Sequence, residues 1–229
     1  MFALALLVSL GELPSVESKE FTTTVQQAAV QATVRIEDSA RKTEGSGVIL
    51  RKRGPWIYVL TANHVVKGAT KLQISTYSQK SYPQPEAIYP AITVLARSEV
   101  ADLALLRFTT NDTPPGVLPI CSSKKAIKDK VFSVLTVGCT GGKPPTPQLD
   151  QVVDRKFVKR TAEAAPTLVW EMNDRPQHGR SGGPMLDTSG HLLGICSGRS
   201  DGKGYFCHVE AIHAFLDSQG HGWLTEEGP

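Results

Sequence analysis

The chain has 229 residues, of which 40% are hydrophobic and 21% are charged, and its formal net charge is +3. This composition excludes a disordered or fibrous protein, and the 20 glycines and 15 prolines favour many turns over long helices. Lys and Arg are scattered apart from two short groups, at 51–53 and 124–130, which are better explained as solvated turns or strand edges, so no nucleic-acid partner is predicted.

The first ten residues form an apolar run that has the length of a signal-peptide core and is too short to span a bilayer. No Lys or Arg precedes the run, and the best cleavage candidate, after Ser9-Leu10-Gly11, fits the small-x-small pattern loosely. We predict that residues 1–11 are a signal peptide and that the protein is exported, to the periplasm or out of the cell. A buried N-terminal strand or a mis-assigned start is the alternative.

After a polar lead at 12–24, short β-branched runs alternate with clusters of Gly, Pro, Ser and Asn, which indicates an all-β protein. Only two helical segments are predicted, a short turn after Asn63 and a helix over Val209–Asp217 whose apolar residues recur every three or four positions. Examples of the predicted strands are Ala32–Ile36, Gly47–Leu50, Trp56–Thr61, Lys71–Thr76, Ile92–Ala96, Leu103–Phe108, Val131–Val137 and Leu168–Met172.

The turn-rich segment 109–116 reads as a linker between two halves of one domain, which spans residues 25–218. The halves cover about 25–110 and 117–218. Residues 219–229 are polar and rich in glycine, and they are predicted to form a loose tail.

The cysteines form no Cys-x-x-Cys pair, which makes a zinc ribbon improbable. Cys196 and Cys207 lie in apolar runs joined by the turn-rich segment 197–204, so a hairpin could bring them together in a disulfide. Three pairings and free buried thiols all remain open. A metal site made by Cys196, Cys207, His208 and His213 is disfavoured, because the two histidines do not share a helix face well, and no metal or other cofactor is predicted.

The strongest local motif is Gly179-Arg180-Ser181-Gly182-Gly183-Pro184, in which glycines surround a serine and leave its hydroxyl uncovered. Such a loop can aim backbone N–H groups at one point. Acyl transfer needs this arrangement, because negative charge grows on the carbonyl oxygen as the nucleophile adds.

A serine hydroxyl is a weak nucleophile at neutral pH and needs a base, which in turn needs a group to orient it. His64 lies at the end of the apolar run Leu60–Ala62 and is the candidate base. Asp102 comes immediately before a buried run, where a carboxylate is costly unless it is paired. Ser181, His64 and Asp102 are therefore the candidate catalytic residues.

Thr61-Ala62-Asn63-His64, Asp102-Leu103-Ala104-Leu105-Leu106 and Gly179-x-Ser181-Gly182-Gly183-Pro184 resemble the three triad motifs of trypsin-like serine proteases, in the same order. Two further stretches, 45–49 and 190–195, resemble the bacterial Deg-type branch more than the digestive enzymes. The similarity covers about residues 32–216. It implies two six-stranded antiparallel β-barrels packed together, with the active site between them and one short C-terminal helix.

The resemblance also implies a serine endopeptidase that acts on polypeptide substrates. Ser181 would attack the carbonyl carbon, His64 would take its proton and return it to the leaving amine, and Asp102 would hold the imidazole. The backbone N–H groups of Gly179 and Ser181 would bind the oxyanion.

The specificity pocket is the least determined part of the site. His178, Ser197 and Gly198 are the candidates for lining it. An Asp174 or Asp201 at its base would favour Arg or Lys substrates, but a preference for small or apolar side chains is favoured slightly.

The chain departs from the family pattern at two points. Arg180 stands where many trypsin-like zymogens have an aspartate that pairs with a newly cut N-terminus, and no Ile-Val-Gly-Gly start is present, so that activation route is not expected. Deg-type enzymes also lack this aspartate. They usually carry a peptide-binding domain after the protease, however, and only about a dozen residues follow the predicted final helix, so their regulation and trimer formation are not carried over.

Two other classes of function compete with the endopeptidase. An α/β-hydrolase esterase would need a helix directly after the serine, which Gly182-Gly183-Pro184 opposes, and only 48 residues follow Ser181. A protease fold that binds without catalysis, or whose site is gated, is the main alternative. The sequence assigns no oligomeric state.

Overall fold

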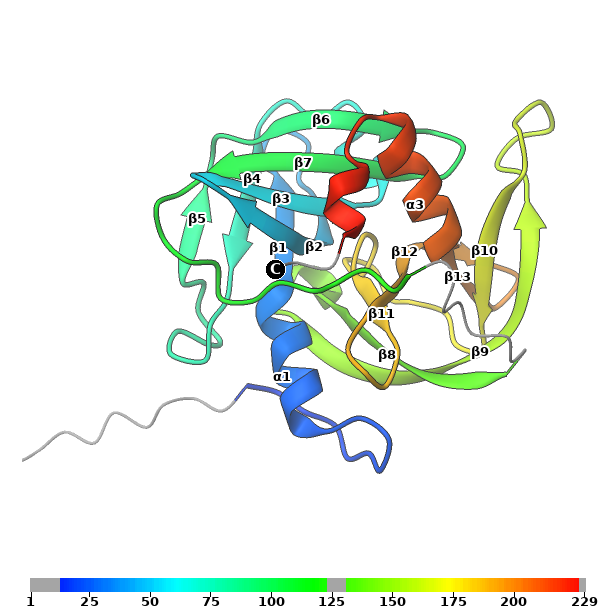
Figure 1. The fold of residues 1–229 in the computed structure, drawn as a ribbon, viewed down its shortest axis with the longest axis horizontal. Helices are drawn as coiled ribbons and strands as arrows, with labels where there is room; N and C mark the ends of the chain where they lie inside the picture. Colours follow the sequence, from blue (N-terminus) through cyan, green and yellow to red (C-terminus); the bar gives the residue numbers. More distant parts are fainter. Residues whose placement is uncertain (1–12, 123–130, 227–229) are drawn as a thin grey trace, which may run out of the picture.

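The computed structural model describes residues 13–122 and 131–226, which form two β-rich halves (Figure 1). The predicted signal segment at 1–11 and the basic group at 124–130 lie outside these residues. Among the helices of the two described ranges, none has the length and apolar character needed to cross a membrane.

The first half is a curled antiparallel sheet of seven strands, in the order β5-β4-β1-β2-β3-β7-β6. A closed six-stranded barrel was predicted here. The difference arises at the short strand β5, which extends the sheet beyond β4 and leaves it open between β5 and β6. The strands are β1 (Thr33–Asp38), β2 (Thr43–Arg53), β3 (Trp56–Thr61), β4 (Leu72–Thr76), β5 (Ala87–Tyr89), β6 (Thr93–Ser98) and β7 (Leu103–Thr109).

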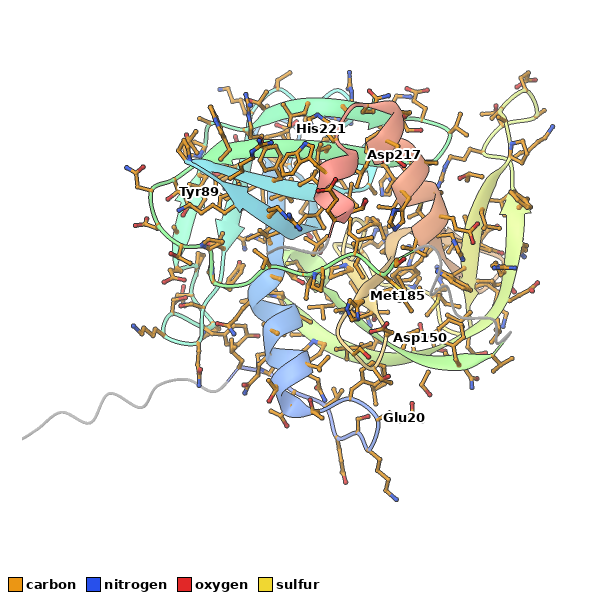
Figure 2. The ribbon with its side chains drawn as sticks, viewed as in Figure 1. Glu20, Tyr89, Asp150, Met185, Asp217 and His221 are labelled. Carbon is orange, nitrogen blue, oxygen red and sulfur yellow. The ribbon has the colours of Figure 1, made fainter. Side chains whose placement is uncertain are left out.

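The second half is a closed barrel of six strands, in the order β10-β13-β12-β11-β8-β9, as predicted. Met185 lies inside the molecule, whereas Tyr89 lies at the outer edge of the first sheet (Figure 2). The overall architecture is the chymotrypsin-like one expected from the motifs. The barrel strands are β8 (Phe132–Gly138), β9 (Thr146–Val158), β10 (Thr167–Met172), β11 (Pro184–Leu186), β12 (Leu192–Ser200) and β13 (Lys203–His208).

Both predicted helices are confirmed, as α2 (Asn63–Val66) and α3 (Val209–Ser218). Helix α3 buries Val209, Ile212 and Phe215, the face that the apolar spacing indicated. A short 3-10 helix, η2 (Thr140–Gly142), lies between β8 and β9.

A third helix, α1 (Thr23–Ala32), was not predicted. It begins where the hydroxyl of Thr22 accepts a hydrogen bond from the Val25 N–H, and it packs against β8 and β9 of the barrel as well as against β1. Its buried face includes Gln26, whose amide nitrogen donates to the carbonyls of Val16 and Phe21. The lead at 12–24 is therefore packed against the domain from residue 13 onward.

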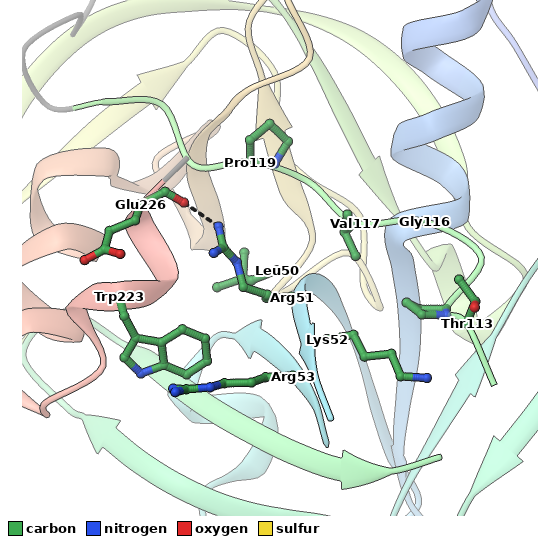
Figure 3. A pocket seen from close by; sticks show the side chains of 11 residues that line it. Leu50, Arg51, Lys52, Arg53, Thr113, Gly116, Val117, Pro119, Trp223 and Glu226 are labelled. Atoms are coloured by element: carbon green, nitrogen blue, oxygen red, sulfur yellow. Dashed lines mark hydrogen bonds between the residues drawn. The ribbon is translucent and has the colours of Figure 1, made fainter. Parts of the chain in front are cut away.

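The predicted loose tail is also packed, as far as Glu226. A 3-10 helix, η3 (Gly222–Thr225), places Trp223 edge-on to Tyr58 with ring centroids 5.0 Å apart, and Leu224 is buried. Figure 3 shows the Arg53 guanidinium beside the Trp223 ring and the hydrogen bond from Arg51 to the Glu226 carbonyl. Burial of Leu224 and partial burial of Trp223 outweigh the polar composition of the surrounding residues.

Candidate active site

His64 and Asp102 are joined in the first half by contacts to both backbone and ring. The Asp102 carboxylate accepts a hydrogen bond from the His64 backbone N–H at 2.9 Å, and its other oxygen lies 2.8 Å from His64 Nδ1. Asn63 N–H also donates to the Asp102 carbonyl at 3.0 Å. Helix α2 and the turn before β7 are thus tied together at these two residues.

The second half contributes two side chains to the opposite side of Asp102. The Ser197 hydroxyl donates to Asp102 Oδ2 at 2.5 Å, and Arg160 Nη2 donates to the Ser197 oxygen at 2.5 Å. Arg160 Nη1 lies 3.7 Å from the same carboxylate oxygen, while Arg160 Nε donates to the Val100 carbonyl at 3.1 Å. Asp102 is therefore buried but surrounded by donors.

Burial raises the pKa of the Asp102 carboxyl, but the hydrogen bond and charge of His64, the Ser197 hydroxyl and the Arg160 charge together hold it below its usual value. An ionised carboxylate only accepts hydrogen bonds, so the proton between it and His64 must reside on Nδ1. Nε2 is then left with its lone pair, and the His64 side chain is 45% exposed. The arrangement provides an oriented base that a substrate can reach.

The loop around Ser181 depends on glycine at two positions. Gly179 has φ of 86° and Gly182 has φ of 84°, in the region that favours glycine. A Cβ at 179 would lie 2.1 Å from the Cys139 carbonyl oxygen, and one at 182 would lie 2.1 Å from that of Ser46. Any other residue would force this loop away from its surroundings.

Two backbone N–H groups of the loop are unengaged. Within the residues that the structure describes, the N–H groups of Gly179 and Ser181 donate no hydrogen bond, whereas Gly182 N–H donates to the Cys196 carbonyl at 2.7 Å. The loop is thus fastened to β12 just after the serine, and the Arg180 N–H donates to the Gln177 carbonyl at 3.2 Å, so the N–H groups of Gly179 and Ser181 on either side of it are left open.

Arg180 anchors the same loop from inside the barrel. Its side chain is buried, and it donates to the Thr136 hydroxyl at 3.0 Å and to the carbonyls of Thr146 and Gly138 at 3.2 and 3.5 Å. Burial lowers the pKa of this guanidinium. Many zymogens have a buried aspartate at this position. Here a buried arginine occupies it, held by neutral hydrogen-bond acceptors.

Ser46 on β2 joins the two halves at the site. Its backbone N–H donates to the Ser181 carbonyl at 2.7 Å, and its hydroxyl donates to the Gly179 carbonyl at 2.7 Å and accepts from the Cys139 N–H at 2.8 Å. Next to it, a Cβ at Gly45 would meet both Val65, the neighbour of His64, and the Ser181 carbonyl. The histidine and the serine therefore face the same interface, although no hydrogen bond joins their side chains in the described part of the chain.

The predicted pocket residues have separate surroundings. Ser197 is buried against Asp102 and so belongs with the acid-base pair, while Gly198 borders open space. His178 is exposed, and its Nε2 lies 2.7 Å from Arg199. Asp174 and Asp201 are exposed, so neither forms a buried charged floor.

The predicted disulfide between Cys196 and Cys207 is not formed, and both thiols are free and buried. Cys196 pairs with Phe206 and Cys207 with Ile195 across β12 and β13. A one-residue offset puts the two side chains on opposite faces of the sheet. Burial raises the pKa of each thiol to about 12, so both stay protonated at neutral pH.

The residues of the alternative metal site also point to other partners. His208 caps helix α3 by accepting the Glu210 N–H at 3.0 Å, and His213 Nε2 lies 2.8 Å from the Cys121 carbonyl. In the two described ranges, no three His, Cys, Asp or Glu side chains are grouped to hold a metal ion.

Sequence reasoning missed Arg160 and Ser46. Arg160 lies in the hairpin loop between β9 and β10 and reaches Asp102 across the interface, which no local pattern indicates. Ser46 stands in the stretch 45–49 that resembles the Deg-type branch, so a signal was present there without a role attached to it.

Comparison with known proteins assigns the chain to a family. The family model described as "Trypsin-like peptidase domain" matches residues 45–195. The chain is 29% identical over 168 residues to "Serine protease Do-like HtrA" of Bacillus subtilis, covering 70% of this chain and 35% of that protein. It is 26% identical over 190 residues to "Protease Do-like 1, chloroplastic" of Arabidopsis thaliana, covering 76% and 38%. The chain thus spans about a third of the length of these relatives.

Solved structures share the fold. The active form of the Rv3671c protease from M. tuberculosis superimposes with a TM-score of 0.72 at 18% identity, covering 96% of this chain and 94% of that one. The inactive form of the Rv3671c protease gives 0.68 at 20% identity, covering 86% and 93%.

Proposed function

The chain belongs to the trypsin-like peptidase family, and we propose that it is a serine endopeptidase that hydrolyses peptide bonds through an acyl-enzyme intermediate. The observation that carries the proposal is the His64–Asp102 pair, in which His64 Nδ1 lies 2.8 Å from the buried and ionised carboxylate of Asp102. Polypeptides are the substrates, and the chemistry requires no cofactor.

In the proposed mechanism, Ser181 Oγ attacks the carbonyl carbon of the scissile bond while His64 Nε2 accepts its proton. Nε2 then gives that proton to the leaving amine, and water hydrolyses the ester in a second round of the same chemistry. Asp102 remains ionised and stabilises the imidazolium. The unengaged N–H groups of Gly179 and Ser181 are the donors for the oxyanion.

A gated or inactive protease fold is the second candidate. One observation favours it: in the described part of the chain, no hydrogen bond joins the His64 ring to the Ser181 hydroxyl. Catalytic hydrogen bonds are often long without substrate, so this geometry is also compatible with an active enzyme. Export of the protein rests on residues 1–11 alone and is part of the proposal.

The test is labelling of the purified protein with a fluorophosphonate, beside the Ser181→Ala and Ser189→Ala variants, followed by peptide mapping. We expect modification of Ser181 alone, with loss of labelling in Ser181→Ala and normal labelling in Ser189→Ala, whose serine is exposed in a turn. A folded protein that reacts only after peptide is added would favour the gated site. A folded protein that never reacts would overturn the catalytic proposal.

A further inference from the structure

A hollow of about 540 Å³ beside the candidate active site is lined by positive charge. Lys156, Lys159, Arg160 and Arg199 all contribute to its wall, and no acidic side chain does. Together the four cations set up a positive field, because like charges lining a concave surface reinforce one another.

Two of these cations have only neutral partners among the described residues, Lys159 the Ala162 carbonyl and Arg199 the Pro176 carbonyl and the His178 ring. Lys156 pairs with Glu171, and Arg160 lies 3.7 Å from Asp102. Lys159 and Arg199, by contrast, have no carboxylate within ion-pair distance among the described residues. The field of the hollow is therefore not cancelled locally.

The hollow also has room for a side chain next to the backbone of β12. Gly198 forms part of its wall, and a Cβ at this position would meet nothing within 4 Å. Tyr205, opposite Gly198 on β13, offers a ring beneath Lys156, whose ammonium lies 5.1 Å from the ring centroid. An aliphatic stem can rest on this ring while a charged group reaches the cations.

The path of β12 connects the hollow to Ser181. The Gly182 N–H binds the Cys196 carbonyl at 2.7 Å, so β12 passes the nucleophile loop at residue 196. β12 pairs with β11 only as far as Ile195, which leaves one edge of residues 197–200 open for an extended peptide. At about 3.3 Å per residue, the far end of this edge is roughly 13 Å from the loop.

A second hollow adjoins the cationic one and reaches His64, the candidate base. It is lined by His64 and Asp102, and it shares Arg160 and Ser197 with the cationic hollow. A peptide that places its scissile bond at Ser181 and lies along the open edge of β12 would therefore present the side chains roughly two to four residues away to the cations.

From this geometry we infer that the hollow is a substrate subsite for a carboxylate, so that the enzyme prefers peptides with Glu or Asp roughly two to four residues from the scissile bond, on the side that runs along β12. The inference rests on the proposed peptidase function and adds a substrate class to it. It differs from the preference for small or apolar side chains expected at the specificity pocket, because it concerns another position of the peptide.

The test is a positional scan with fluorescence-quenched peptides of neutral sequence, in which Glu or the uncharged Gln is placed at each position around the cut. We expect kcat/KM to be about five-fold higher for Glu than for Gln at these positions and on one side only. The ratio should shrink at high salt, because exposed charges are screened. Equal rates for Glu and Gln at every position would overturn the inference.

Charge reversal identifies the residues. Lys159→Glu and Arg199→Glu should each lower the Glu-to-Gln ratio, and the double variant should favour Lys over Glu at the same position. Lys19→Glu is the matched control, because it changes the net charge equally on the exposed lead next to Glu20, which Figure 2 places at the far end of the molecule. If Lys19→Glu lowers the ratio as much as Lys159→Glu, the overall charge and not the hollow is responsible, and the subsite does not exist.

Fluorophosphonate labelling of the same samples separates this inference from the proposed function. Normal labelling and peptide cleavage without a charge preference would overturn the subsite and leave the peptidase intact. Absence of labelling and cleavage in the folded wild-type protein would overturn both.

Discussion

The two halves of the molecule hold their catalytic candidates in different ways. In the first half, direct hydrogen bonds join His64, in helix α2, to Asp102, in the turn before β7. In the second half, the Ser181 loop leans on the other half, because the carbonyls of Gly179 and Ser181 both accept hydrogen bonds from Ser46. Both members of the candidate acid-base pair thus lie in the first half, with added contacts from Ser197 and Arg160, whereas the placement of the candidate nucleophile depends on the interface.

This difference teaches where activity should be sensitive. Damage to the His64–Asp102 pair should remove the base without disturbing the loop. Damage to the interface should displace the loop and its N–H donors while the base remains oriented.

The largest effect is expected from Asp102→Asn. Asn can donate its amide N–H toward His64 Nδ1 and so favour the wrong tautomer, which should lower kcat by about 10⁴-fold while the fold is kept. Peptide hydrolysis and circular dichroism measure the two properties. Asp154→Asn, on the exposed side of β9, is the control and should be fully active. A loss of only a few-fold in Asp102→Asn would mean that the pair is not the base of this enzyme.

The second half should also make stability depend on pH through His208. This histidine is buried, and burial lowers its pKa to about 4. The unfolded chain, with an ordinary pKa of about 6.5, then binds the proton first. Stability should therefore fall as the pH drops from about 6.5 to about 4, by a total of about 3 kcal/mol.

Urea unfolding at a series of pH values measures this loss. His208→Asn keeps an acceptor for the Glu210 N–H and cannot titrate, so its stability should be flatter over the same range. An unchanged pH dependence in this variant would assign the effect to other groups.

Ser46→Ala tests the interface itself. It removes a buried hydroxyl that binds the Gly179 carbonyl and the Cys139 N–H, and should lower the free energy of unfolding by about 1 to 3 kcal/mol. The labelling rate of Ser181 should fall as well. Ser75→Ala is a matched control, because the Ser75 hydroxyl is equally buried but has no hydrogen-bond partner within residues 13–122 and 131–226. Equal effects of the two variants would argue against a special role of Ser46.

The smallest effect is expected from Arg160→Gln. This variant tests whether the candidate acid-base pair depends on Arg160, which belongs to the second half. Arg160 helps to hold the pKa of Asp102 below its ordinary value of about 3.9. A lowered carboxyl pKa stabilises the fold above that ordinary value, and this stabilisation is lost as the pH falls through the folded pKa. Without Arg160 the folded pKa lies higher, so less stabilisation remains and acid unfolding should begin at a higher pH.

Arg160→Lys, which keeps the charge, should resemble the wild type in an acid titration followed by circular dichroism. Coincident acid transitions for Arg160→Gln and the wild type would show that Arg160 does not help to keep Asp102 ionised, and that His64 and Ser197 are sufficient.

The sequence was informative where one element carries its own pattern. The strand Trp56–Thr61 and the helix after His208 have continuous or regularly spaced apolar residues, and both occur as predicted. β9 was missed because most of its residues are polar and at least partly exposed. Helix α1 was missed because its buried face mixes small residues with Gln26, a polar residue that is satisfied only by contacts with the lead.

The site divides in the same manner. Motifs made Ser181, His64 and Asp102 the catalytic candidates, because each lies in a short segment with a recognisable local context. Arg160 could not be predicted, since its role depends on a contact across 58 residues of chain to Asp102. The disulfide hypothesis failed on register, because bringing two strands together does not decide which face each cysteine occupies.

Each end of the described chain packs against the half from which it is distant in sequence. Helix α1 precedes the first sheet but packs on β8 and β9, while η3 follows the barrel but packs through Trp223 on Tyr58 of the first sheet. Each half is consequently in contact with a terminal segment that is covalently part of the other half. A cut in the connecting segment 110–116 should leave a non-covalent two-chain particle, and separately produced fragments should complement one another as a split enzyme does.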